Sequence, residues 1–170
     1  MHSIGDKVVY GANGVMSIVD IREECVADIV KKYYVLRANG AHSDSLTFVP
    51  VDNEKLVRAM RPLLTKDEIL ELLHSVNVDE ECEWVRDNRA RSERFKNIMN
   101  SGDRAQIISM IHSIYKTGLR RGEEGKKNFL VDENAMHKAE KILYSEFSIV
   151  LGIPEDEVPA FIEREIANAK

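Results

Sequence analysis

In the stretch PLLTKDEILELL, residues 62–73, the chain changes from one kind of secondary structure to another. Thr65 and Glu68 have the spacing of a capping box, in which each side chain accepts a hydrogen bond from the other residue's backbone at a helix start. Apolar residues then recur at helical spacing: Ile69, Leu70, Leu72 and Leu73. The pattern upstream of this stretch is typical of strands. We therefore predict two domains, a β-rich one over residues 1–62 and a helical one over residues 63–170.

Short β-strands are predicted for the first domain, because its apolar runs are rich in Val, Ile, Tyr, Phe and Thr and are separated by turn-forming residues. The predicted strands are Lys7–Tyr10, Val15–Arg22, Val30–Arg37 and Leu46–Val51, with a short fifth strand at Leu56–Met60. Pro50 cannot donate a hydrogen bond to a neighbouring strand, which places the fourth strand at an edge or at its end. So many short antiparallel strands in about sixty residues predict a small antiparallel β barrel.

About five helices are predicted for the second domain, which makes the whole chain an α+β protein with two domains. The first helix follows Thr65, and the second runs from about Glu81 to Met99. Further helices begin near Asp103, Asp132 and Pro159, and a basic loop with glycines is expected from Gly118 to Gly125. The fourth helix is expected to end at Gly152, because glycine readily adopts the left-handed conformation that ends helices.

Charge is distributed unevenly along the chain. The net charge is −5, yet residues 84–128 carry eleven basic and five acidic side chains, a net charge of +6 that leaves −11 for the remainder. Such a basic block is either a solvated helix face or an electrostatic footprint for phosphate, and charge alone favours the solvated face.

The composition indicates a cytoplasmic globular protein. No apolar run approaches the roughly 18 residues of a membrane helix, and the first thirty residues contain no apolar signal-peptide core. The two cysteines, Cys25 and Cys82, lie far apart in the sequence, which fits a reducing compartment better than a disulfide framework. We therefore expect no membrane partner.

Enzyme motifs do not occur in the sequence. It lacks the glycine-rich phosphate loops, the Gly-x-Ser-x-Gly nucleophile motif and the His-Glu-x-x-His metal motif. His42, Ser43 and Asp44 are adjacent, so their side chains cannot face one another as a catalytic triad requires. Cys82 lies between two glutamates, which disfavour a reactive thiolate. We expect no catalysis, cofactor, metal or small-molecule substrate.

Trp84 is the only tryptophan, and it opens the basic segment in the sequence WVRDNRAR, residues 84–91. Two interpretations remain open at this point. Trp84 packs into the helical domain, as large aromatic residues usually do. Alternatively, its ring is exposed between arginines and stacks on a nucleic-acid base while the arginines hold phosphates.

Several segments, in their order and spacing, resemble the CarD/CdnL family of bacterial transcription regulators. In the first domain these are IGDKVVY at residues 4–10, NGV at 13–15, YYVLR at 33–37 and LTFVPV at 46–51. In the second domain they are Glu83, Trp84 and Arg86, followed by Arg94 to Lys96, Ser101 to Asp103, and Ala139 to Glu146. The likeness covers nearly the whole chain.

The resemblance implies a Tudor-like first domain that binds the RNA polymerase β subunit, as in the transcription-repair coupling factor. It implies a helical second domain that contacts promoter DNA, with a tryptophan wedged into the minor groove at the upstream edge of the melted bubble. By residue match Trp84 is the wedge, and Arg86 and Arg89 contact the DNA backbone. Arg91 is added as a DNA contact from helical spacing. The residues expected to bind polymerase are Arg37, Leu46, Phe48 and Pro50.

The sequence departs from the family pattern in three places. Tyr10 is followed by Gly11 where many members have proline, and Phe48 stands where some members have a basic residue. This second change predicts a more apolar polymerase interface. The basic loop at residues 118–128 also differs, so its residues receive no role. The alternative function is an adaptor that binds polymerase without touching DNA.

Overall fold

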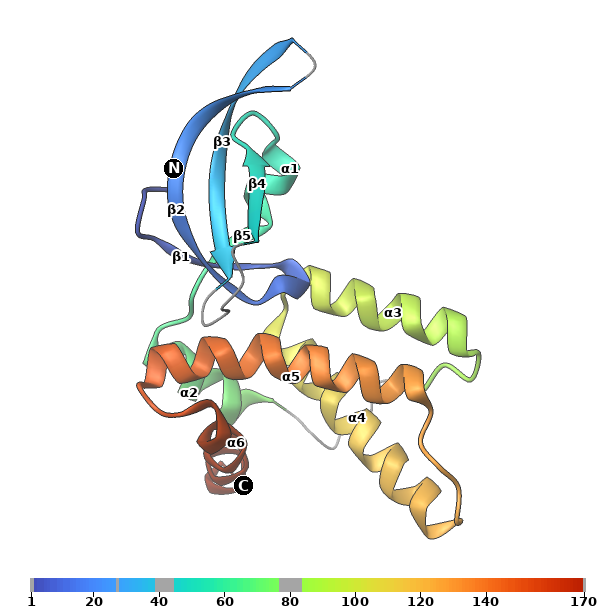
Figure 1. Cartoon of the computed structure of the whole chain (residues 1–170). Helices are drawn as coiled ribbons and strands as arrows, with labels where there is room; N and C mark the ends of the chain where they lie inside the picture. Colours follow the sequence, from blue (N-terminus) through green and yellow to red (C-terminus); the bar gives the residue numbers. More distant parts are fainter. Residues whose placement is uncertain (1, 27, 39–44, 77–83, 170) are drawn as a thin grey trace. The chain divides into compact units, whose positions relative to one another are not determined.

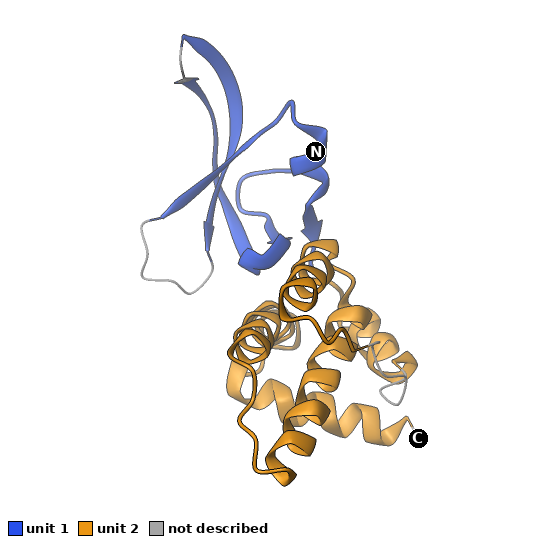
Figure 2. Ribbon diagram, turned by 90° about the vertical axis from the view of Figure 1, so that its right-hand side faces the viewer, with its two compact units in different colours: residues 1–63 blue, residues 64–170 orange. Residues whose placement is uncertain are grey.

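The computed structural model describes residues 2–26, 28–38, 45–76 and 84–169. The chain forms two compact units, Met1–Leu63 and Leu64–Lys170, which are coloured separately in Figure 2. The first unit carries the strands and the second carries the long helices. A two-domain α+β organisation is therefore confirmed.

Unit 1 is a five-stranded antiparallel sheet with the order β4-β3-β2-β1-β5 (Figure 1). Its strands are β1 (Lys7–Tyr10), β2 (Val15–Val26), β3 (Ile29–Ala38), β4 (Leu46–Pro50) and β5 (Met60–Pro62), and a short 3-10 helix, η1 (Gly11–Asn13), joins β1 to β2. Among the described residues β4 and β5 are the two ends of the sheet, so the sheet is open. The prediction of a small antiparallel barrel is therefore confirmed in part: the strands are antiparallel, but the sheet they form is not closed.

The short helix α1 (Glu54–Arg58) packs against both end strands, β4 and β5. A short fifth strand was predicted at Leu56–Met60; the structure has this strand at Met60–Pro62, because the chain is helical until Arg58. The helix is stabilised at its start by the Asn53 side chain, which accepts a hydrogen bond from the Leu56 backbone N–H at 3.2 Å. An Arg58–Glu54 ion pair of 3.1 Å, one turn apart, adds support on the exposed side.

One face of the sheet forms the core of unit 1. Side chains from all five strands meet there: Val8, Met16, Ile18, Tyr34, Leu36, Val49 and Met60. Leu56 and Val57 of α1 pack against this cluster. The opposite face of β3 and β4 carries the alternate residues, among them the exposed Arg37 and Phe48, because successive residues of a strand point to opposite faces.

Unit 2 contains five α-helices within the described residues: α2 (Lys66–Ser75), α3 (Asn88–Ser101), α4 (Arg104–Glu123), α5 (Leu130–Leu151) and α6 (Val158–Asn168). A 3-10 turn, η2 (Glu155–Glu157), precedes α6. Helix α5, orange in Figure 1, contacts each of the other four helices. Its buried side chains Ala139, Ile142, Leu143 and Phe147 therefore form the centre of the helical unit.

The predicted capping box begins α2. The Thr65 hydroxyl accepts a hydrogen bond from the Glu68 N–H at 3.2 Å, and the Glu68 carboxylate accepts one from the Thr65 N–H at 2.7 Å. The hydrogen bond from the Thr65 backbone also lowers the pKa of the Glu68 carboxyl group. Two of the unsatisfied N–H groups at the helix start thus find partners, which is why the helix begins at this point.

Two helix boundaries in unit 2 differ from those predicted. Helix α3 begins at Asn88 rather than near Glu81, because the Asp87 side chain accepts a hydrogen bond from the Ala90 N–H at 2.8 Å and caps the helix there. Residues 81–83 of the predicted helix lie outside the described residues. Helix α4 continues through Gly118 to Glu123, where a loop was predicted.

No described helix has both the length and the hydropathy needed to cross a membrane.

Candidate nucleic-acid and polymerase contacts

Trp84 lies in the extended segment that precedes α3, and its side chain is half-buried. The guanidinium carbon of Arg91 lies 4.6 Å from the centroid of the indole ring. The buried ring of Phe95 on α3 approaches it edge-on, with 6.4 Å between the ring centroids and 62° between their planes. Trp84 is thus held on one side by the helical unit and remains accessible to solvent in part. The geometry lies between the two interpretations drawn from the sequence.

Arg91 lies beneath Trp84 and is 1% exposed. Its Nε and Nη2 donate to the two carboxylate oxygens of Asp132, at 2.7 and 3.2 Å. Nη1 donates to the backbone carbonyls of Val85 and Arg86, at 2.8 and 3.2 Å, and Nη2 also donates to Asn88 Oδ1 at 2.8 Å. A guanidinium group that is buried and bonded in this way does not reach a phosphate. The expected DNA contact at Arg91 is therefore not supported by its position.

Arg86 and Arg89 are both exposed and lie on either side of Asp87, the N-cap of α3. Arg86 belongs to the same extended segment as Trp84, whereas Arg89 lies in the first turn of the helix. Lys96, two turns further along α3, is also exposed. Arg86, Arg89 and Lys96 are thus three exposed cations, one before α3, one in its first turn and one close to its middle.

Phe129 is a contact of Arg91 that the sequence analysis missed. It precedes α5, and the guanidinium carbon of Arg91 lies 5.0 Å from the centroid of its ring. The guanidinium carbon of Arg121, at the end of α4, lies 3.9 Å from the same centroid. A phenylalanine directly after a basic loop was the available signal. Its role could not be read from local spacing, because Phe129 and Arg91 are far apart in the sequence.

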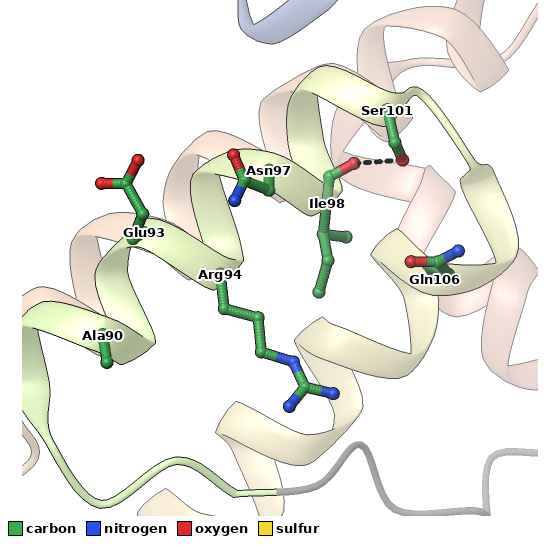
Figure 3. A pocket seen from close by; sticks show the side chains of 7 residues that line it. All are labelled: Ala90, Glu93, Arg94, Asn97, Ile98, Ser101 and Gln106. Carbon is green, nitrogen blue, oxygen red and sulfur yellow. Dashed lines mark hydrogen bonds between the residues drawn. The ribbon is translucent and has the colours of Figure 1, made fainter.

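An open depression of about 640 Å³ lies between α3 and the start of α4 (Figure 3). Its lining residues are Ala90, Glu93, Arg94, Asn97, Ile98, Ser101 and Gln106. Ser101 donates a hydrogen bond of 2.7 Å to the Ile98 carbonyl, drawn as the dashed line in Figure 3. Glu93 and Arg94 are the titratable residues of this lining, and they form no acid–base pair of carboxyl, imidazole or thiol groups. In the described part of the chain, no group of three His, Cys, Asp or Glu side chains is placed to hold a metal ion.

The four residues predicted to bind polymerase lie together on one face of unit 1. Leu46, Phe48 and Pro50 alternate along β4, and Arg37 of β3 is the direct cross-strand partner of Leu46. Phe48 is 40% exposed. Strand β4 pairs with β3 on one side and is an end strand of the sheet among the described residues. These residues form a continuous surface at a sheet edge, which we call the β4 surface.

Two further side chains surround Phe48 on the β4 surface. The ring of Tyr33 meets the Phe48 ring edge-on, with centroids 6.1 Å apart. The Arg22 guanidinium carbon lies 5.5 Å from the Phe48 centroid. The surface therefore has an aromatic centre with a cation beside it, which is a composition enriched in protein–protein interfaces. Arg22 and Tyr33 were not among the predicted contacts.

Comparison with known families accounts for both units. Residues 2–63 match the family model of the CarD-like/TRCF RID domain, and residues 68–163 match that of the CarD C-terminal domain. No curated protein matches the chain. The two matches together span most of the sequence, in the order that the resemblance predicted. The chain belongs to the CarD family, whose domains are those of non-enzymatic transcription factors that interact with RNA polymerase.

Proposed function

We propose that this protein binds the RNA polymerase β subunit through the β4 surface and stabilises the promoter open complex by wedging Trp84 at the upstream edge of the bubble. The observation that carries the DNA contact is the position of Trp84, half-buried beside the exposed Arg86 at the start of the basic helix α3. The family membership supports the polymerase contact.

At the edge of melted DNA the free-energy cost of inserting a side chain between bases is lower than in duplex DNA. Inserting an apolar side chain between stacked bases normally costs a few kcal/mol, and this cost falls where the bases are already separating. The accessible part of the Trp84 ring can then stack on the exposed base, while Arg86 and Arg89 contact phosphates on either side. This arrangement distinguishes melted from closed DNA and reads little of the sequence, because stacking is available to every base.

The β4 surface offers the polymerase both backbone and side-chain contacts. An end strand has backbone N–H and C=O groups on its outer side that can pair with a strand of another protein. Phe48, with Tyr33 and Arg22 around it, adds an apolar anchor beside that edge. Strand pairing and the Phe48 anchor then both contribute affinity, and the side chains of the β4 surface add specificity.

Substituting Phe48→Ala is expected to weaken polymerase binding about 5- to 30-fold, which is the effect of removing a central aromatic anchor. Binding of the full chain to the isolated β subunit would be measured by surface plasmon resonance. Ile4→Ala is the matched control, because Ile4 is an exposed apolar residue of the same unit that lies outside the β4 surface. Unchanged affinity for Phe48→Ala, or an equal loss for Ile4→Ala, would contradict the assignment.

The assignment of polymerase binding to unit 1 has its own test. Residues 1–63 are expected to retain the β subunit in a pull-down, and residues 64–170 are expected not to. Circular dichroism of both fragments establishes that each one folds by itself. If only the folded 64–170 fragment retained the β subunit, the polymerase contact would lie in unit 2, which contradicts the assignment to unit 1.

Salt dependence tests the arginine contacts. With Arg91 buried, about two to three cations reach phosphates, so the log–log slope of DNA affinity against salt should be about −2 to −3. Arg86→Ala and Arg89→Ala should each reduce the slope by roughly 1. The measurement is fluorescence anisotropy on fork-junction DNA, with Arg164→Ala on α6 as an exposed control. An unchanged slope in both variants would exclude these arginines.

The adaptor function remains the second candidate, because Trp84 packs against Arg91 and Phe95. In that case Trp84 orders the segment before α3, and polymerase binding is independent of promoter DNA. The two functions differ in what a folded Trp84 variant loses. If the protein is an adaptor, a folded Trp84 variant leaves the open complex as stable as the wild type does. If Trp84 is the wedge, the same variant makes the open complex less stable.

A further inference from the structure

The four side chains Trp84, Arg91, Phe129 and Arg121 form an alternating series of aromatic rings and guanidinium groups. Arg91 lies within 5.0 Å of two ring centroids, those of Trp84 and Phe129. Arg121 then lies against Phe129 at 3.9 Å. Contacts of this kind hold planar groups at defined distances. The series joins the segment before α3 to the end of α4 and the start of α5.

Hydrogen bonds fix the two ends of this series. Arg91 holds the carbonyls of Val85 and Arg86, which are the two residues that follow Trp84 in the chain. At the other end, Arg121 Nε and Nη2 donate to the Lys127 carbonyl at 2.9 and 2.7 Å. The backbone that follows Trp84 is not helical, and the Arg91 side chain holds it in place through these two hydrogen bonds.

Asp132 anchors Arg91 from α5. Its side chain is 5% exposed and that of Arg91 is 1% exposed, so both charges are removed from water. A buried ion pair contributes little net stability compared with apolar side chains of the same volume. Its planar, two-pronged geometry does fix orientation, which lysine cannot reproduce. The pair is thus better suited to set a geometry than to strengthen the fold.

We infer that Arg91 is a positioning residue for Trp84, with Asp132 as its anchor and Phe129 as a second aromatic contact. Arg91 fixes both the ring, by stacking, and the backbone of the segment that carries the ring, by hydrogen bonds. The orientation of Trp84 is consequently set by α5, although Asp132 lies 48 residues further along the chain. The consequence for open complexes rests on the proposed function, whereas the effect on the Trp84 ring does not.

The single tryptophan allows this inference to be tested directly, because fluorescence excited at the long-wavelength edge, where tyrosine does not absorb, reports Trp84 alone. In Arg91→Lys we expect emission at longer wavelength and stronger quenching by acrylamide, since the ring loses its cover and its segment loses two hydrogen bonds. The open-complex lifetime should fall roughly 2- to 30-fold, the range expected for one lost cation–π contact.

Arg104→Lys is the matched control. Arg104 forms a comparable two-pronged ion pair elsewhere in unit 2, with Nη2 and Nε donating to the Glu146 carboxylate at 2.8 and 3.1 Å. The variant should lower the melting temperature by a similar amount and leave acrylamide quenching of Trp84 unchanged. Phe129→Leu removes the contacts of the aromatic ring with Arg91 and Arg121 and leaves the hydrogen bonds of Arg91 in place. It serves as the second variant if Arg91→Lys does not fold.

A double variant separates positioning from a general effect. If Arg91 acts through Trp84, Arg91→Lys should shorten the open-complex lifetime in the wild-type background and have no further effect in the Trp84→Ala background. Unchanged acrylamide quenching in folded Arg91→Lys and Phe129→Leu would overturn the inference, and so would equal losses of lifetime in both backgrounds. A normal lifetime for Trp84→Ala itself would instead refute the proposed wedge, and the quenching measurement would still decide the role of Arg91.

Discussion

Substituting Trp84→Ala is expected to shorten the lifetime of the promoter open complex about 5- to 150-fold, since base stacking on an aromatic ring contributes about 1–3 kcal/mol. The variant removes the accessible part of the ring, which is the part available to DNA. Polymerase binding through unit 1 should be unchanged. The measurement is the decay of heparin-resistant complexes formed by polymerase, promoter and the full chain.

Trp84→Phe is the control for this variant, because it retains an apolar aromatic wedge. It should restore part of the lost lifetime. Trp84 also packs on Arg91 and Phe95, so Trp84→Ala should cost some folding stability, about 1–3 kcal/mol for a half-buried side chain. Lifetimes are therefore compared below the melting temperature of the variant. A folded Trp84→Ala protein with a normal lifetime would support the adaptor function instead.

Substituting Glu146→Ala is expected to lower the free energy of unfolding of unit 2 by about 3–5 kcal/mol, because it removes one partner of a buried ion pair. Glu146 is 0% exposed and accepts three hydrogen bonds: from the Leu64 N–H at 2.9 Å, from Arg104 Nη2 at 2.8 Å and from Arg104 Nε at 3.1 Å. Its removal leaves a largely buried guanidinium group and a backbone N–H without this acceptor. Urea unfolding followed by circular dichroism measures the change.

Two comparisons define what the Glu146 result means. Glu155→Ala, at an exposed position, should change the free energy of unfolding by less than about 0.5 kcal/mol. The double variant Arg104→Met with Glu146→Leu should recover much of the loss, since it leaves no charge buried. A loss below about 1 kcal/mol for Glu146→Ala would show that the ion pair does not hold the helical unit together.

Local signals in the sequence predicted much of the fold. The capping box at Thr65 and Glu68 marks the first helix of unit 2, because its two hydrogen bonds involve neighbouring residues only. The strands β1 and β4 were predicted from short runs rich in Val, Tyr, Phe and Thr that lie between turn-forming residues. Helix α1 was missed because Leu56 and Val57 form a short apolar run that fits a strand equally well. The N-cap residue Asn53 was the signal that distinguished a helix from a strand at this position.

The candidate site was predicted less completely, for a physical reason. The expected phosphate contact at Arg91 assumed that Trp84 lies on the same helix, one turn or two before it. The helix instead begins after its N-cap, Asp87, so Trp84 lies before α3. Helical spacing therefore does not relate the direction of the Trp84 side chain to that of Arg91. The buried Arg91 side chain pairs with Asp132, which belongs to α5. The two residues are far apart in the sequence, so no local sequence pattern predicts the pair. Arg86 and Arg89 are exposed as the proposal requires, and their contact with DNA stays a prediction.

A site-specific crosslink from position 84 tests whether Trp84 contacts the edge of the bubble. A photo-reactive phenylalanine derivative replaces Trp84 in the full chain, and the complex with polymerase and promoter DNA is irradiated. If Trp84 is the wedge, crosslinks form to DNA at the upstream edge of the bubble, in open complexes and not in closed ones. Crosslinks to polymerase alone, or to DNA equally in closed and open complexes, would contradict this role of Trp84.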